Sequence, residues 1–189
     1  MTKQRLASII SIVFDPLVEG PILLIIFFLA KSTAPFWLLV LIVFIDTFFP
    51  ILFMFYGLKR GFISDWETTN RHERHSLNFV LLLITFLNLF LFYIFSDSFL
   101  LRAFFVFLIL ILIYALITFF WKISGHMTAN TAFVITLNIL SGWQLWWLVF
   151  LLPLVAWARL VRNKHDVWQI LGGVALASLI VLCGASFLF

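Results

Sequence analysis

The chain has 189 residues, of which 65% are hydrophobic, 19% aromatic and only 11% charged. This composition excludes an ordinary soluble domain and indicates a protein embedded in a lipid bilayer. The formal net charge of +4 lies mostly in the connections between apolar runs. Because the sequence has no long basic face, we expect no nucleic-acid partner.

Apolar runs fill most of the sequence, beginning with residues 6–30. Asp15 and Pro16 interrupt this first run, and we expect a kink there because proline removes a backbone donor. The run has no small-residue cleavage site, so we do not expect a cleaved signal peptide. The second run, 33–57, carries Asp46 near its middle. An ionisable residue at this depth either pairs with a buried polar group or marks a substrate or ion path.

The later apolar runs are 77–95, 103–121, 127–158 with a break at Ser141-Gly142, and 167–189. A bilayer core about 30 Å thick requires roughly 20 apolar residues per helix. Runs of this length do not fit the alternating pattern of a membrane barrel. We therefore expect an all-α bundle of six to seven transmembrane segments that forms a single membrane-embedded domain over residues 1–189.

Three short polar motifs stand at the ends of these runs. The first spans residues 65–74, the second is Ser124-Gly125-His126, and the third consists of Arg159, His165 and Gln169. Neighbouring motifs are separated by two apolar runs, and two membrane crossings return the chain to the side it left. All three motifs are thus predicted at one membrane face. Most of the other basic residues are predicted on that face too, which favours the cytoplasmic side.

The third motif provides a histidine with a partner for its ring. If the last helix begins near His165, Gln169 lies one turn further along on the same face. Its side-chain oxygen can then accept a hydrogen bond from one imidazole nitrogen. The other nitrogen is left for nucleophilic attack.

The second motif begins a helix and is typical of an anion site. Backbone N–H groups at a helix start, the Ser124 hydroxyl and a glycine that permits close approach can cradle an anion. His126 lies beside that position, where it can protonate a leaving oxygen. Lys122 precedes the motif, and Arg71 and Arg74 of the first motif suit bidentate phosphate recognition. These residues indicate phosphoryl transfer, and no ligand cluster suggests a metal or another cofactor.

Together the motifs resemble those of the type 2 phosphatidic acid phosphatase superfamily. That family has a basic first motif ending in Arg-Pro, then Pro-Ser-Gly-His, then Ser-Arg, five residues, His, three residues and Asp. The matching segments here are residues 71–74, 123–126 and 158–169, within a resemblance that covers roughly residues 59–175.

The resemblance also has departures. Ile123, His75 and Gln169 stand where the family has Pro, Pro and Asp, and the leading lysine of the first motif has no clear match. The chain is similar to a membrane subgroup that has Gln in the last position and an Asp-rich first motif.

Specific roles follow from this resemblance. It implies that His165 attacks phosphorus to form a phosphohistidine and that His126 protonates the leaving alkoxide. It also implies that Glu73 sets the neighbouring arginine by an ion pair, and that Asp65 holds an arginine or another cation. The residues implied to bind phosphate are Arg71, Arg74, Ser124, Gly125 and Arg159.

The expected substrate is a membrane lipid phosphate or an isoprenoid (di)phosphate. The segment 127–140 is only about 21 Å long as a helix, so a spanning helix here would hold Ser124 and His126 below the head groups. A recessed site fits a substrate with a long apolar tail better than a soluble sugar phosphate. The predicted function is therefore a metal-independent membrane phosphatase.

Other interpretations stay open. The basic loop alone is typical of contact with lipid head groups, and Ser124 alone is typical of a helix cap. One alternative is a catalytically silent relative that binds phospholipid or isoprenoid head groups. Another is a small transporter that uses Asp15, Glu19 and Asp46. Changing Asp46 to Asn would abolish transport, whereas changing His165 to Ala would abolish a phosphatase.

Overall fold

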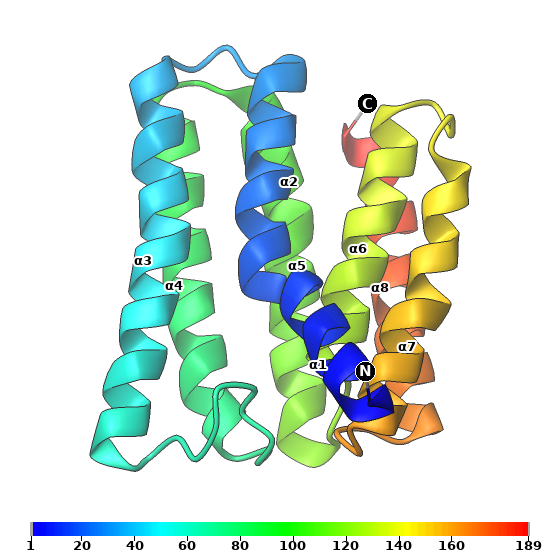
Figure 1. The fold of residues 1–189 in the computed structure, drawn as a ribbon. Helices are drawn as coiled ribbons and strands as arrows, with labels where there is room; N and C mark the ends of the chain where they lie inside the picture. The colour runs from blue at the N-terminus through cyan, green and yellow to red at the C-terminus, as the bar shows by residue number, and fades with distance from the viewer. Residues whose placement is uncertain (1, 189) are drawn as a thin grey trace. The chain divides into compact units, whose positions relative to one another are not determined.

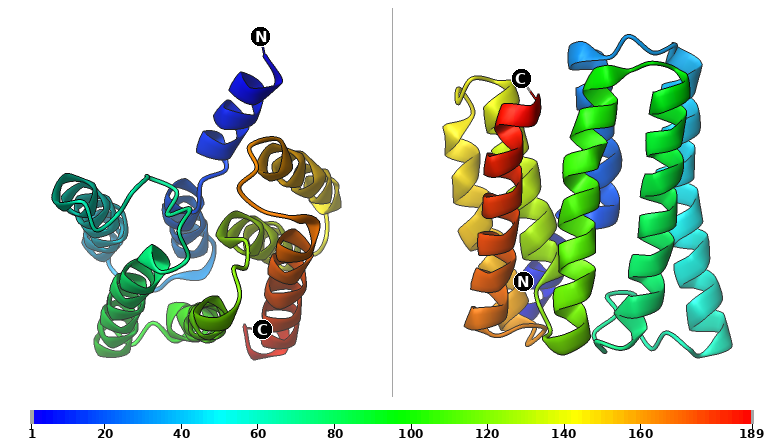
Figure 2. Two further views of the ribbon diagram at one scale, coloured as in Figure 1. Left: turned by 90° about the horizontal axis from the view of Figure 1, so that it is seen from below. Right: turned by 180° about the vertical axis from the view of Figure 1, so that it is seen from behind.

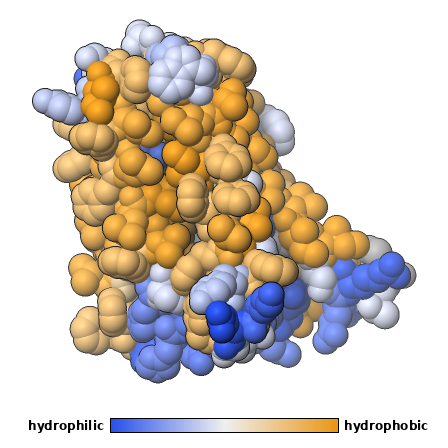
Figure 3. Space-filling view, turned by 90° about the vertical axis from the view of Figure 1, so that its left-hand side faces the viewer, coloured by the Kyte–Doolittle hydropathy of each residue, from blue (hydrophilic) through white to orange (hydrophobic). Residues whose placement is uncertain are grey.

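The computed structural model describes residues 2–188, which form helices joined by short connections, with no strand among them (Figure 1). Within this described part, five helices are long and apolar enough to cross a membrane. They are Lys3–Lys31, taken as one segment, and Phe36–Arg60, Glu73–Ile94, Ser98–Phe120 and Val167–Phe187. The protein is therefore an all-α integral membrane protein. Hydrophobic side chains cover most of the face in Figure 3, and hydrophilic ones gather at its lower end.

The predicted count of six to seven membrane segments is not confirmed. Helix α6 (Gly125–Leu140) has 16 residues, and the apolar stretch Trp146–Val161 is of similar length, so neither reaches the length of the other five. The chain divides into two compact units, residues 2–20 with 123–187 and residues 21–122. Each unit is described by itself, and the single domain stays a prediction.

The unit of residues 21–122 contains most of α2 (Pro16–Lys31) and all of α3 (Phe36–Arg60), α4 (Glu73–Ile94) and α5 (Ser98–Phe120). Helix α4 packs against both α3 and α5, and Figure 2 shows these helices side by side. The ring of Phe27 on α2 contacts the rings of Phe99 and Phe107 on α5 edge-on, at centroid distances of 5.6 and 6.1 Å. Apolar side chains therefore hold this bundle together.

A buried aspartate joins two turns of this unit. Asp97 is 1% exposed, and its Oδ1 accepts a hydrogen bond from the Leu100 N–H (2.9 Å), which caps α5. Its Oδ2 accepts from the Ser32 hydroxyl (2.6 Å) and from the N–H groups of Thr33 (3.0 Å) and Ala34 (3.2 Å). A buried carboxylate is tolerated when it is hydrogen-bonded in this way. The turn after α2 is thereby tied to the start of α5.

Asp46 has a partner within the same bundle. The Nδ2 of Asn88 on α4 donates to Asp46 Oδ1 on α3 at 2.7 Å. This is the pairing with a buried polar group that the sequence allowed, and it links two adjacent membrane helices.

The other unit contains α1 (Lys3–Val13), α6, the 3₁₀ helix η1 (Trp146–Phe150), α7 (Leu151–Val161) and all but the last residue of α8 (Val167–Leu188). Helix α1 packs on α7 through one cluster of buried apolar side chains. Another apolar cluster contains residues of α6, α7 and α8. The predicted interruption of the first run is present, because α1 ends at Val13 and α2 begins at Pro16. The predicted break at Ser141-Gly142 is also a turn, with left-handed backbone at Gly142 (φ +60°).

Candidate functional site

Ser124 starts α6 and attaches it to α8. Its hydroxyl faces the N–H of Met127 at 3.4 Å, as expected of an N-cap serine. Its own N–H donates to the carbonyl of Gln169 on α8 at 3.1 Å. The second motif and the last residue of the third are therefore joined through the backbone.

Gly173 lets α8 come this close to α6. A Cβ atom at position 173 would lie 2.8 Å from the Ser124 carbonyl oxygen and 3.0 Å from Thr128 Oγ1. The Thr128 hydroxyl itself donates to that carbonyl at 2.9 Å. Only a residue without a side chain fits here without moving one of the helices.

His165 and Gln169 form the predicted pair. His165 Nδ1 lies 2.8 Å from Gln169 Oε1, and the histidine is 7% exposed. The side chain of Asp166 accepts from the Gln169 N–H at 2.9 Å, which fixes the first turn of α8. With the amide oxygen as acceptor, the ring proton lies on Nδ1 and the lone pair on Nε2. This is the tautomer that a histidine nucleophile attacking through Nε2 requires.

Arg159 lies in the last turn of α7 and is 1% exposed. Its Nη1 donates to the Ser11 hydroxyl at 3.3 Å and lies 3.5 Å from His126 Nε2. The Arg159 carbonyl accepts from the Lys164 N–H at 3.1 Å, which closes the connection leading to His165. A charge this deeply buried lies where an anion would be attracted strongly, because water screens it little.

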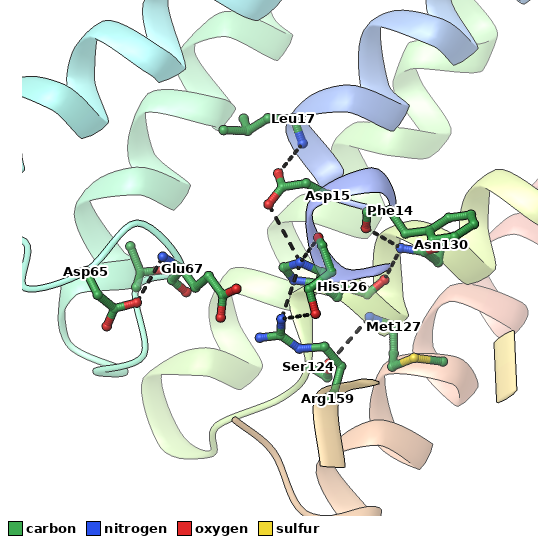
Figure 4. Close-up of polar contacts among 12 residues, drawn as sticks. Phe14, Asp15, Leu17, Asp65, Glu67, Ser124, His126, Met127, Asn130 and Arg159 are labelled. Carbon is green, nitrogen blue, oxygen red and sulfur yellow. Dashed lines mark hydrogen bonds and ion pairs between the residues drawn. The ribbon is translucent and has the colours of Figure 1, made fainter. Parts of the chain in front are cut away.

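His126, near the start of α6, lies at the centre of the polar contacts in Figure 4. Its Nε2 is 3.3 Å from the Ser11 carbonyl oxygen and 3.6 Å from Asp15 Oδ2. Together with Arg159, these residues form what we call the His126 cluster: Ser11, Asp15, His126 and Arg159. The four residues come from α1, from the break that follows it, from α6 and from α7, respectively.

Asn130 fixes the chain around this cluster. Its Nδ2 donates to the Phe14 carbonyl at 3.0 Å and to the His126 carbonyl at 2.9 Å. The break after α1 is therefore bound directly to α6.

Ser11, Asp15 and Asn130 were not predicted as site residues. Asp15 did give a signal, since an ionisable residue within an apolar run marks an interior partner or a function. Its partner, however, is far away in sequence. Ser11 carried no such signal, because a single serine within an apolar helix is common and does not indicate a site.

The first motif lies in the other unit, where its side chains shape a loop. Asp65 accepts from the N–H groups of Glu67 (2.9 Å, Oδ1) and Thr69 (3.1 Å, Oδ2). The buried Arg74 donates through Nε to the Thr68 carbonyl at 2.8 Å, and Thr68 has left-handed backbone (φ +46°). Thus Asp65 and Arg74 both bind the loop's backbone.

Glu73 also acts on this loop. The family resemblance implied an ion pair between its carboxylate and Arg74, whereas Oε2 accepts from the N–H (2.9 Å) and the hydroxyl (3.1 Å) of Ser64. Arg71 and Lys122 belong to the same unit as this loop. Their convergence with His126 and His165 stays a prediction.

Among residues 2–188, no group of three or more His, Cys, Asp and Glu side chains is placed to hold a metal ion. Comparison with protein-family models, curated proteins and solved structures found no match to this chain. The fold and the contacts thus define an integral membrane helical protein that contains a buried histidine and arginine cluster and an oriented second histidine.

Proposed function

We propose that the protein is a membrane phosphatase that hydrolyses a lipid phosphate or an isoprenoid (di)phosphate through a phosphohistidine. The observation that carries the proposal is the 2.8 Å bond between His165 Nδ1 and Gln169 Oε1. The Gln169 backbone is bonded to Ser124, so this oriented histidine belongs to the same unit as His126 and Arg159.

In the first step, His165 Nε2 attacks phosphorus. A P–N bond forms while the P–O bond to the leaving group breaks, and His126 gives the leaving oxygen a proton. That leaving group is an alkoxide from a phosphate monoester, or a phosphate monoester from a diphosphate. Arg159 and the N–H groups of Gly125 and His126 at the start of α6 bind the non-bridging oxygens as charge develops on them.

In the second step, a water molecule attacks the phosphorus of the phosphohistidine. The water loses a proton to His126, the P–N bond breaks, and inorganic phosphate leaves with His165 restored. Gln169 holds the ring throughout, but as a neutral group it adds no charge to stabilise the cationic phosphoimidazole.

The proposal also includes the first motif, whose convergence with the two histidines is an expectation from the sequence alone. Arg71, Arg74 and Lys122 would then supply further positive charge to the phosphate. The excess of basic residues predicted on this side favours a site at the cytoplasmic face. Entry from the bilayer would favour substrates with long apolar tails.

The test is release of inorganic phosphate by the purified protein in detergent with EDTA. Phosphatidic acid, a phosphatidylglycerophosphate and a polyprenyl diphosphate would be compared, with His165→Ala as the inactive variant and the exposed His72→Ala as the matched control. We expect release from at least one substrate, lost in His165→Ala and kept in His72→Ala. Release that survives in His165→Ala would contradict the mechanism.

Gln169 favours one second candidate, a catalytically silent relative that binds phospholipid or isoprenoid head groups, because the amide lacks the charge of an aspartate. That candidate predicts no release from any substrate by a protein that is folded and still binds anionic lipid. Binding to vesicles with and without phosphatidic acid, measured beside the release assay, separates the two.

A further inference from the structure

We propose that Asp15 is a positioning residue that holds His126 as the proton donor for the leaving group. The inference rests on the proposed phosphatase function. Asp15 lies in the break between α1 and α2, and its Oδ2 is 3.6 Å from His126 Nε2. Figure 4 shows Asp15 and Arg159 approaching the His126 ring from different directions.

The charges around His126 explain why a carboxylate is needed. Arg159 Nη1 lies 3.5 Å from Nε2, and a cation at this distance disfavours the protonated ring. A general acid must nevertheless carry its proton when the substrate binds. The negative charge of Asp15 offsets the arginine, and the Ser11 carbonyl, 3.3 Å from Nε2, gives the Nε2 proton an acceptor.

This arrangement also selects the atom that transfers the proton. With the Nε2 proton held by Ser11 and Asp15, the Nδ1 proton of the imidazolium passes to the leaving oxygen. The Nδ1–H bond breaks as the new O–H bond forms, and the neutral ring keeps its proton on Nε2. The carboxylate is not itself protonated, as in other carboxylate–histidine pairs.

Asp15 has a second contact, which offers a purely structural explanation for an aspartate at this position. Its Oδ1 accepts from the Leu17 N–H at 2.9 Å, which caps the start of α2. Asparagine and serine cap helices about as well as aspartate, but neither carries a charge. If capping were the only role of Asp15, Asp15→Asn and Asp15→Ser would behave like the wild type.

The experiment compares two long-chain phosphate monoesters in the purified full-length protein, one with an alkoxide leaving group and one with a nitrophenolate. The nitrophenolate leaves without a proton, so its first-turnover burst does not depend on a general acid. The size of that burst also counts the functional sites in each preparation, which corrects for any misfolded fraction. Wild type, Asp15→Asn, Asp15→Ser, His126→Asn and the Asp15→Asn/His126→Asn double variant would be measured.

We expect Asp15→Asn to slow the first turnover of the alkyl ester by at least ~10-fold, but by no more than the ~10²–10⁴-fold that a general acid contributes in full. The nitrophenol burst rate should stay close to that of the wild type. Asp15→Ser should follow Asp15→Asn, and the double variant should be no slower than His126→Asn alone.

Equal losses on both esters, or a wild-type rate for Asp15→Asn on the alkyl ester, would overturn the role of Asp15. A wild type that releases no phosphate from either ester would instead overturn the proposed function and the inference with it. The two failures are therefore distinguishable.

Discussion

Gln169 separates two tasks that one carboxylate usually performs beside a nucleophilic histidine. Its amide oxygen lies 2.8 Å from His165 Nδ1, so it can fix the ring's orientation and its tautomer. It carries no charge with which to stabilise the ring once phosphorus is bound to Nε2. The rate of the first step should therefore depend on what stands at this position.

We predict that Gln169→Glu keeps or raises kcat, because the near-isosteric carboxylate adds a charge at the same place. Gln169→Met has a similar length, but its thioether sulfur is only a weak acceptor. This variant should lower kcat by ~10²–10⁴-fold, the loss expected when a catalytic histidine is misoriented. Phosphate release measures both, with thermal unfolding as the check on folding. A Gln169→Met variant with the full rate would show that the hydrogen bond has no catalytic role.

Some of these residue contacts were predictable from sequence and others were not. The Ser124 cap and the His165–Gln169 pair depend on spacings within one helical turn, which the sequence displays directly. The contact between Asp15 and His126 depends on how α1 packs against α6 and α7. Apolar periodicity does not say which helices become neighbours, so this contact required the structure.

At the scale of the elements, the close approach of α8 to α6 determines where the second motif lies. Gly173 leaves room for the Ser124 carbonyl, and the Ser124 N–H is bonded to Gln169 one turn earlier on α8. Any side chain at 173 would push these helices apart at the start of α6. The residues beginning there are those proposed to bind phosphate.

We predict that Gly173→Ala destabilises the protein by about 1–3 kcal/mol, as overpacking does, and also lowers kcat by displacing Ser124. Gly20→Ala is the matched control, because a Cβ there meets no atom within 4 Å. The control should be neutral or stabilising by up to ~1 kcal/mol, since alanine favours a helix interior. Thermal unfolding and phosphate release measure the pair, and equal behaviour of the two variants would refute the packing argument.

The boundaries of the elements differ from the apolar runs for a physical reason. Helix α4 begins at Glu73, ahead of the run at 77–95, because polar residues of the first motif join its first turn. Hydropathy marks what faces lipid, not where helical hydrogen bonding starts. The run expected after Gly142 begins as a turn and continues as η1 before α7 starts at Leu151. Left-handed backbone at Trp143 marks that turn, and composition does not reveal it.

At the scale of the whole molecule, the number of membrane crossings depends on α6 and on the apolar stretch Trp146–Val161. The 16 residues of α6 span about 24 Å, which is less than the roughly 30 Å of a bilayer core. Hydropathy identifies apolar runs whatever their helical length, so the α6 region was counted among the six to seven predicted segments. The five longer helices meet the length requirement without it.

A labelling experiment tests both the crossing and the orientation. Cys183 is the single cysteine, so Cys183→Ser provides a background for Asn70→Cys, between α3 and α4, and Gln144→Cys, between α6 and η1. If α4, α5 and α6 all cross, a membrane-impermeant maleimide should label position 70 from the cytoplasmic side and position 144 from the opposite side. Labelling of both from one side would show that α6 does not cross. Reversed labelling would contradict the cytoplasmic face.

The bond between the Ser124 N–H and the Gln169 carbonyl has a consequence for mutational tolerance. It involves no side chain, so among single substitutions at its two ends only proline at 124 removes a bonding group. The side chains around the histidines can therefore be substituted one at a time while this backbone hydrogen bond between α6 and α8 is kept. Insertions or deletions within α6 would instead shift Ser124 relative to α8. Single-residue deletions there should be far less tolerated than substitutions at the same positions.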